Sequence, residues 1–173
     1  MTLPEHDQPK LSEIIPHLTQ RMVRLEPGSL ARLRRMDPEG PGEAEFWKLA
    51  IECGLGTSNR HQRLVQLLGL LTPKGEPQKN AKTLHDGSKP FGKVLAKTDY
   101  PEMRLMRFLA LPFEQRDGAL ERMIRWVAAK GHDGVNCTDI AMLLLSANDG
   151  PPRKLAETYY RQKYVQENKE DAA

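Results

Sequence analysis

The stretch SNRHQRLVQLLGLLTP, residues 58–73, decides the fold class of this chain. Its leucines recur at intervals of three and four residues, at Leu64, Leu67, Leu68 and Leu71. This spacing puts them on one face of an α-helix, opposite the polar residues between them. Ser58 is a favoured residue immediately before a helix, and Pro73 cannot continue one. The stretch therefore predicts an amphipathic helix over residues 59–71.

Similar helical patterns flank this stretch along almost the whole chain. Further helices are predicted over residues 12–24 or 17–24, 29–36, 43–53, 90–97, 101–111, 113–130 or 115–130, 136–144 or 138–144, and 152–167. Pro27 is expected to end the first helix, Ser29 to cap the second, and Gly54 and Gly131 to end later ones. No segment alternates apolar and polar residues over four or more positions, as a strand does. The sequence thus predicts an all-α fold of about eight to nine helices.

The predicted helices fall into two small packed helical bundles. An N-terminal bundle over residues 1–111 contains a long basic loop at residues 72–89, and a C-terminal bundle over residues 112–173 ends in an acidic tail. The loop is expected to be mobile, because helical periodicity disappears there while glycine, proline and lysine are frequent.

Composition agrees with a soluble helical protein. Of the 173 residues, 39% are hydrophobic, only 6% are aromatic and 28% are charged, whereas strands favour aromatic and β-branched residues. The longest apolar run, residues 141–145, is too short to cross a bilayer. Residues 1–10 are polar and include Glu5 and Asp7, unlike the start of a signal peptide. We therefore expect a cytoplasmic protein without a membrane span.

The distribution of charge favours a negatively charged partner. The formal net charge is +3. Residues 74–97 contain six lysines and only two acidic residues, Glu76 and Asp86, which gives this segment a net charge of +4. The tail has a balance of −2, from Glu167, Glu170 and Asp171 against Lys169. A basic middle of this kind is typical of proteins that bind polyanions, and a solvated lysine-rich loop is the alternative.

Residue patterns typical of catalytic and metal sites are absent from the sequence. The five histidines have neither HxxxH nor HExxH spacing, and Cys53 and Cys137 are far apart without a CxxC motif. There is no GxxxxGK loop followed by Ser or Thr, no GxGxxG loop and no GxSxG elbow. We therefore expect no metal, no cofactor and no enzymatic activity, although catalytic groups can converge from distant positions.

Arginine and lysine recur on the predicted helices, mostly at spacings that share a face. The pairs are Arg32 and Arg35, Arg60 and Arg63, Lys93 and Lys97, Arg104 and Arg107, and the adjacent Arg153 and Lys154. Guanidinium groups bind phosphate oxygens in a bidentate manner, and ammonium groups act as point charges. Each pair alone is typical of a solvated helix face. Together, on a chain without active-site motifs, they indicate a surface that follows phosphates.

Four stretches carry a resemblance to a known family: LARLRRMDPEGPGEAEFWKLA, RHQRLVQLLGLL, PFGKVLAKTDYPEMRLMRFLAL, and LERMIRWVAAKGHDGVNCTDIAMLLLSANDGPPRKLAETYYRQKY. In this order, over most of residues 30–164, they resemble the CasB family, the small subunit of the type I-E CRISPR surveillance complex called Cascade. Two places depart from the family pattern. Asn136-Cys137 stands where the family often has Asp-Trp, and Leu155 stands where a tryptophan is common.

The resemblance implies an all-helical, non-catalytic protein that pairs head to tail with a second copy and contacts other Cascade subunits. Its nucleic-acid partners are expected to be crRNA and target DNA, held by their backbones, so that the R-loop and the displaced strand are stabilised. The positions that match the family's basic residues are Arg34, Arg35, Arg60, Lys93, Arg104, Arg153 and Lys154.

These expectations lead to a specific hypothesis for residues 29–50. The segment is predicted to be a phosphate clamp, in which leucines and the Phe46-Trp47 pair anchor the chain and the arginines face a strand. Two alternatives remain open. In the first, the protein is a helical scaffold without direct nucleic-acid contact. In the second, it is an enzyme acting on nucleic acid, for which the sequence shows no carboxylate cluster suited to divalent metals.

Overall fold

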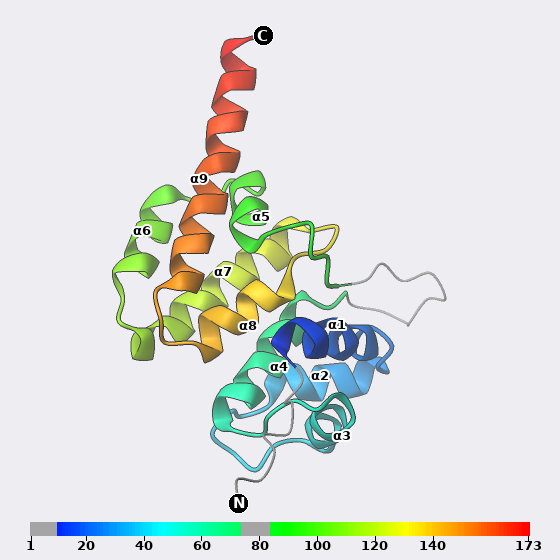
Figure 1. Cartoon of the computed structure of the whole chain (residues 1–173). Helices are drawn as coiled ribbons and strands as arrows, with labels where there is room; N and C mark the ends of the chain where they lie inside the picture. Colours follow the sequence, from blue (N-terminus) through cyan, green and yellow to red (C-terminus); the bar gives the residue numbers. More distant parts are fainter. Residues whose placement is uncertain (1–9, 74–83) are drawn as a thin grey trace, which may run out of the picture.

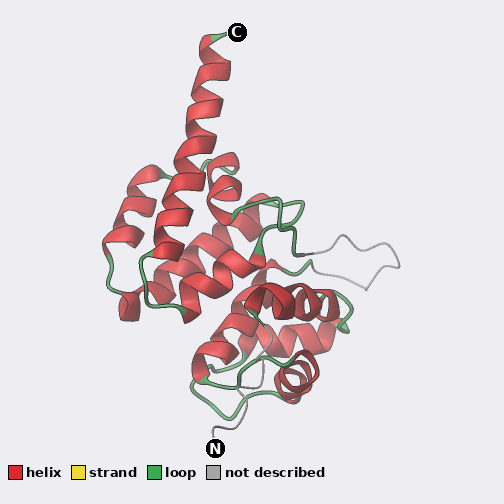
Figure 2. Ribbon diagram, in the orientation of Figure 1, coloured by secondary structure: helices red, strands yellow, loops and turns green. Residues whose placement is uncertain are grey.

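The computed structural model describes residues 10–73 and 84–173. Within these ranges the chain forms nine α-helices and one short 3-10 helix, and no strand (Figure 1). The elements are α1 (Leu11–Met22), α2 (Pro27–Arg35), α3 (Ala44–Cys53), α4 (Asn59–Leu71), α5 (Phe91–Lys97), α6 (Glu102–Ala110), η1 (Phe113–Gln115), α7 (Arg116–Lys130), α8 (Cys137–Leu145) and α9 (Gly150–Asp171). Figure 2 shows that loops alone connect them. The prediction of an all-α fold is confirmed.

Helix α4 joins two groups of helices, α1–α4 and α5–α9, and its leucine stripe is buried as predicted. Leu64, Leu67 and Leu68 are completely buried. The helix packs against α2 and also against α7 and α8 of the second group. Buried side chains from all nine of the described α-helices belong to one continuous core, with α1 joining it through contacts with α3 and α8.

Helix α5 lies along α9 in the second group of helices (Figure 1). Gly92 allows this close approach, because a Cβ atom at its position would stand 2.2 Å from the carbonyl oxygen of Leu155 and 2.2 Å from Thr158 Oγ1. The hydroxyl of Tyr159 donates to the carbonyl oxygen of Tyr100 at 2.6 Å. This buried hydrogen bond holds the connection between α5 and α6 against α9.

The helices group as α1–α4 and α5–α9 (Figure 1), which differs from the boundary predicted between residues 111 and 112. Helices α5 and α6 lie with the C-terminal helices, because α5 packs against α9 and α6 packs against α7. Contacts of α4 with α7 and α8, and of α1 with α8, join the two groups.

The beginning of α2 differs from its prediction. Proline has a φ angle suited to the first turn of a helix and lacks an N–H that would be unpaired there. Pro27 therefore begins α2 instead of ending α1, which stops at Met22. Ser29, the expected cap, lies inside α2, and its hydroxyl donates to Glu45 of α3 at 3.1 Å.

Two further segments differ from their predictions. Of the predicted mobile loop, residues 74–83 lie outside the described ranges, but residues 84–89 are held by backbone hydrogen bonds. Val135 N–H donates to Leu84 O at 3.1 Å, and Asn136 N–H donates to Lys89 O at 2.8 Å. Helix α9 continues through the acidic tail and extends beyond the other helices (Figure 1).

No helix in the described ranges has the apolar length that a membrane span needs.

Candidate nucleic-acid interface

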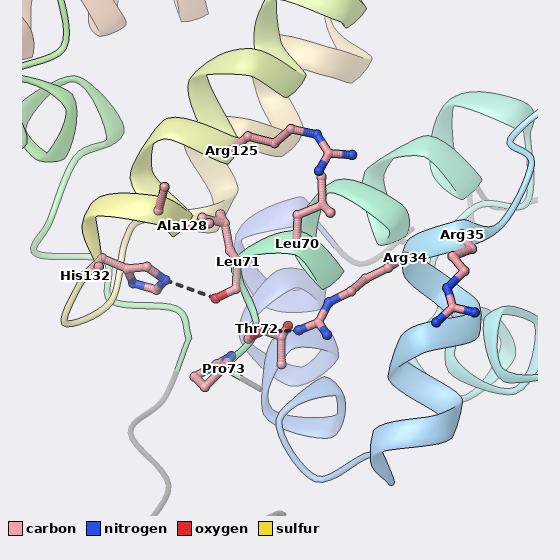
Figure 3. Close-up of a pocket in the computed structure, with 11 residues that line it drawn as sticks. Arg34, Arg35, Leu70, Leu71, Thr72, Pro73, Arg125, Ala128 and His132 are labelled. Atoms are coloured by element: carbon pink, nitrogen blue, oxygen red, sulfur yellow. Dashed lines mark hydrogen bonds between the residues drawn. The ribbon is translucent and has the colours of Figure 1, made fainter. Parts of the chain in front are cut away.

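A groove of about 720 Å³ lies where the C-terminal ends of α2, α4 and α7 meet (Figure 3). Its cationic side chains come from Arg34 and Arg35 on α2 and from Arg125 on α7, and His132 follows α7. Leucine and alanine residues of α4 and α7 line the remainder together with Thr72 and Pro73. None of the described residues that line this groove is acidic. The groove therefore combines positive charge with apolar walls.

Arg34 is fixed in the groove by the end of α4. Its Nε donates to the carbonyl oxygen of Gly69 at 2.7 Å, and a terminal nitrogen donates to the carbonyl oxygen of Thr72 at 2.6 Å. Carbonyl groups at the C-terminal end of a helix have no partner within the helix, so Arg34 satisfies two of them. Burial lowers the pKa of Arg34, but an arginine remains charged at neutral pH.

A hydrogen-bond network connects α2, α4 and α7 beside the groove. Gln66 of α4 donates to the carbonyl oxygen of Met36 at 2.8 Å and accepts from Arg63 at 2.6 Å. Arg63 donates to Glu121 of α7 at 2.5 Å, and the other oxygen of this carboxylate accepts from Arg125 Nε at 2.8 Å. Burial alone would raise the pKa of Glu121, but hydrogen bonds from Arg125 and Arg63 bring it below its usual value.

The network leaves positive charge in excess at this end of the molecule. Arg63 and Arg125 share one carboxylate, that of Glu121, so one of their two charges is unbalanced. Arg34 bonds to neutral carbonyl groups. The side chain of Arg35 is exposed and has no hydrogen bond or ion pair with any described residue. These four arginines and one carboxylate leave three positive charges. Figure 3 shows Arg34 extending toward Thr72 and Arg125 extending from α7.

The ring of His132 is held by the backbone on both sides. Its Nδ1 accepts from the N–H of Gly134 at 3.0 Å, and its Nε2 lies 3.0 Å from the carbonyl oxygen of Leu71 (Figure 3). His132 therefore serves to hold the turn after α7 against the end of α4.

Two more cations lie over the ring of Trp126 on α7. The guanidinium carbon of Arg104 is 5.7 Å from the ring centroid, and Lys130 Nζ is 4.9 Å from it. Such cation–π contacts position a charge without neutralising it. The indole N–H donates to the carbonyl oxygen of Thr98 at 3.1 Å, which fixes the ring. We use the name basic surface for the three arginines of the groove together with the two cations at Trp126: Arg34, Arg35, Arg125, Arg104 and Lys130.

The remaining predicted binding residues lie elsewhere. Arg60 pairs with Asp117 at 3.3 Å, and its guanidinium carbon is 4.2 Å from the centroid of the Phe113 ring. Lys154 pairs with Asp139. These two residues join helices within the chain and are not free cations.

Lys93 and Arg153 lie outside the basic surface in a different way. Lys93 is half-buried on α5, and Arg153 is exposed in the first turn of α9. The side chain of neither residue has a hydrogen bond or an ion pair with a described residue. Of the seven predicted residues, Arg34 and Arg35 line the groove and Arg104 lies over Trp126. Arg60, Lys93, Arg153 and Lys154 do not belong to the basic surface, so the seven residues do not form one track.

The segment 29–50 differs in part from the predicted clamp. Arg32 forms an ion pair with Glu45, and this hydrogen bond lowers the pKa of Glu45 to about 2. Phe46 is completely buried as expected, but Trp47 is 41% exposed and donates to the carbonyl oxygen of Pro41 at 2.9 Å. Of the three arginines in α2, only Arg35 is open to a ligand.

Metal ligands and reactive thiols do not gather near the basic surface. Within residues 10–73 and 84–173, no three His, Cys, Asp or Glu side chains come together as metal ligands do. Both cysteines are buried, and burial raises the pKa of the Cys53 and Cys137 thiols. Thiols with a raised pKa are poor nucleophiles at neutral pH.

Sequence reasoning did not select Arg125, Lys130 or Glu121. Arg125 is three residues after Arg122, the same spacing as between Arg104 and Arg107. This spacing could have identified Arg125 as part of a basic helix face. Lys130 stands immediately before the predicted stop at Gly131, in the last turn of α7. The connection of Glu121 with Arg63, 58 residues apart, had no sequence signal.

Comparison of the chain with protein-family models, with curated proteins and with solved structures found no match. The chemistry of the basic surface and the order of the sequence motifs are therefore what bears on function.

Proposed function

We propose that this chain is a non-catalytic nucleic-acid-binding protein, the CasB-type small subunit of a type I-E CRISPR Cascade complex. In this proposal its partners are crRNA and target DNA, held by their backbones, together with other Cascade subunits and a second copy of the chain. It stabilises the R-loop and the displaced strand and acts in the cytoplasm.

The observation that carries the proposal is the groove at the ends of α2, α4 and α7. Three arginines line it, no described lining residue is acidic, and its walls are partly apolar. A cleft with charge of one sign and walls of low dielectric constant concentrates the field and attracts ions of opposite charge. Guanidinium groups suit phosphate oxygens in particular, because they donate two parallel hydrogen bonds.

The groove suits a backbone more than a base sequence. Its described lining includes no asparagine, glutamine, aspartate or glutamate, and these side chains read adenine and cytosine edges. In an RNA-guided complex the guide reads the sequence by base pairing, so a subunit that holds the backbone needs charge and shape alone. This division of labour supports a stabilising subunit.

The lifetime of the R-loop in a reconstituted Cascade complex tests the proposal. The variant Arg35→Ala/Arg125→Ala removes two cations of the basic surface. The control Arg24→Ala/Arg161→Ala removes two exposed arginines elsewhere, so both variants have the same net charge. We expect the first variant to shorten the lifetime at least about tenfold, because hydrogen bonds to charged groups contribute about 1.5–3 kcal/mol each, and the control to leave it unchanged. Equal lifetimes for both variants would contradict the proposal.

A helical scaffold is the second candidate function. It is favoured by the ion pairs of Arg60 and Lys154, which occupy two predicted binding residues, and by exposed apolar side chains on α6 and α9. In this case the basic surface contacts acidic neighbouring proteins. Complexes that form normally with wild-type protein, fail to assemble with Arg35→Ala/Arg125→Ala, and bind no free oligonucleotide would favour the scaffold.

A further inference from the structure

A second groove, of about 610 Å³, lies between α9 and the start of α6. It is lined by Asp99, Tyr100, Pro101, Glu102, Tyr159, Tyr160, Lys163, Tyr164 and Glu167. Helix α9 extends beyond the other helices from this region (Figure 1). The groove thus brings together all four tyrosines of the chain and three carboxylates.

The tyrosines give the groove an exposed aromatic wall. Tyr159 is fully buried, whereas Tyr160 is 40% exposed and Tyr164 is 67% exposed. The hydroxyl of Tyr160 donates to Glu102 at 3.0 Å, which ties α9 to α6 and fixes the ring. The Tyr159 and Tyr160 rings pack edge to face, with centroids 5.3 Å apart. Exposed aromatic side chains held in fixed positions are typical of contact surfaces between proteins.

The carboxylates make this groove acidic on a chain with a net charge of +3. Asp99, Glu102 and Glu167 against Lys163 leave a local balance of −2. The groove already holds one cation of the chain itself, the ammonium group of Lys163. This group lies 5.7 Å from the centroid of the Tyr159 ring and 3.9 Å from Asp99. Aromatic faces and carboxylates together stabilise a cation, and they repel phosphate.

We infer that this groove docks an arginine-bearing segment of a partner protein. A planar guanidinium stacks on the exposed tyrosine rings and donates to Glu102 or Glu167 at the same time, which a lysine ammonium does less well. The same arrangement occurs within the chain, where Arg60 lies over Phe113 and pairs with Asp117.

The flanks of the docked arginine are expected to be apolar. Met103 and Met106 on neighbouring α6 are 61% and 50% exposed, and methionine side chains adapt to apolar partners. The three carboxylates that line the groove disfavour a nucleic-acid strand as its occupant. The inference is therefore independent of nucleic-acid binding at the basic surface.

Titration of the full-length protein with a capped Leu-Arg-Leu peptide, followed by NMR, tests the inference. Saturable chemical-shift changes are expected at residues 99–102 and 159–167. A peptide with citrulline in place of arginine has nearly the same shape without the charge, and we expect it to bind at least about tenfold more weakly.

Matched variants locate the contact. Glu167→Gln removes a carboxylate of the groove, and Glu170→Gln removes one from the same helix outside the groove. We expect Glu167→Gln and Tyr164→Ala each to weaken arginine-peptide binding about fivefold or more, and Glu170→Gln to leave it unchanged. Equal binding of the citrulline peptide, equal effects of the two glutamate variants, or no saturable shifts would overturn the inference. A dimer in sedimentation that Tyr164→Ala dissociates would overturn it as well, because a second copy of the chain would then fill the groove.

Discussion

The guanidinium of Arg34 donates to the carbonyl oxygen of Gly69, 2.7 Å away, and so ties α2 to the last turn of α4. Arg35, the next residue, has no such contact and is exposed. Two adjacent arginines of one predicted motif thus have different structural roles. Arg34 builds the groove, and Arg35 is free to meet what the groove binds.

This difference predicts unequal effects on stability. Arg34→Ala leaves carbonyl groups of α4 without their charged donor, and we expect it to lower the free energy of unfolding by about 1–3 kcal/mol. Arg35→Ala changes an exposed side chain, and we expect a change of about 0.5 kcal/mol or less. Urea unfolding of both variants measures these values. Similar losses from the two substitutions would show that Arg34 does not hold α4.

Glu121 is predicted to limit the affinity of the basic surface for a polyanion. Its carboxylate accepts from Arg63 and Arg125, so Glu121→Gln increases the net positive charge beside the groove by one. We expect this variant to bind a single-stranded oligonucleotide more tightly than wild type at low salt. Fluorescence anisotropy measures the affinity.

Glu157→Gln is the control for Glu121→Gln, because it frees Arg161 on exposed α9 from a similar ion pair. An equal gain in affinity from both variants would indicate a general charge effect instead of binding at the groove.

Gly92 is predicted to be essential for the packing of α5 on α9. A Cβ atom there would lie 2.2 Å from a backbone carbonyl oxygen of α9, so Gly92→Ala forces the helices apart. We expect a loss of about 3 kcal/mol or more in the free energy of unfolding. Gly118→Ala on α7 is the control, since its Cβ atom would meet only Arg122, at 3.6 Å. It is expected to stabilise the protein by about 0.5 kcal/mol, because alanine favours a helix more than glycine does.

The ion pair between Arg32 and Glu45 predicts a pH dependence. The hydrogen bond from Arg32 lowers the pKa of Glu45 from an ordinary 4.5 to about 2 in the folded protein. A carboxylate with a lowered pKa stabilises the fold above its unfolded pKa and loses this contribution as pH falls through the folded pKa. At neutral pH, wild type is therefore expected to have a higher free energy of unfolding than Glu45→Gln. This difference is expected to disappear as the pH falls from 4.5 to 2. Urea unfolding at several pH values measures the difference, and a constant difference would refute the link.

Local features of the fold were accessible from the sequence. The leucine spacing of residues 59–71 predicted α4 and its buried face, because helical periodicity alone determines which side chains share a face. Gly54 and Gly131 end α3 and α7 with positive φ angles of 73° and 83°, where glycine is favoured. Asn136 caps α8 by accepting from the N–H of Thr138 at 3.1 Å.

The residues of the candidate site were harder to predict from the sequence, because the spacing of residues does not show which helix faces pack against each other. Arg60 and its partner Asp117 are 57 residues apart, and only packing shows that this arginine is neutralised. Likewise, Arg34 bonds to a carbonyl oxygen 35 residues away. Residue type and periodicity identified arginines near the groove, while the tertiary fold decided which of them are free.

The salt dependence of oligonucleotide binding tests the central claim most directly. Arg34 is bound to carbonyl groups, so four cations of the basic surface are open to a ligand. If Arg35, Arg104, Arg125 and Lys130 each contact a phosphate of a single strand, the slope of log affinity against log salt is about −2.8. Arg35→Ala and Arg125→Ala should each reduce its magnitude by about 0.7 and weaken binding to unrelated sequences equally. An affinity that does not change with salt, or a slope that both substitutions leave intact, would contradict a phosphate-binding surface around α7.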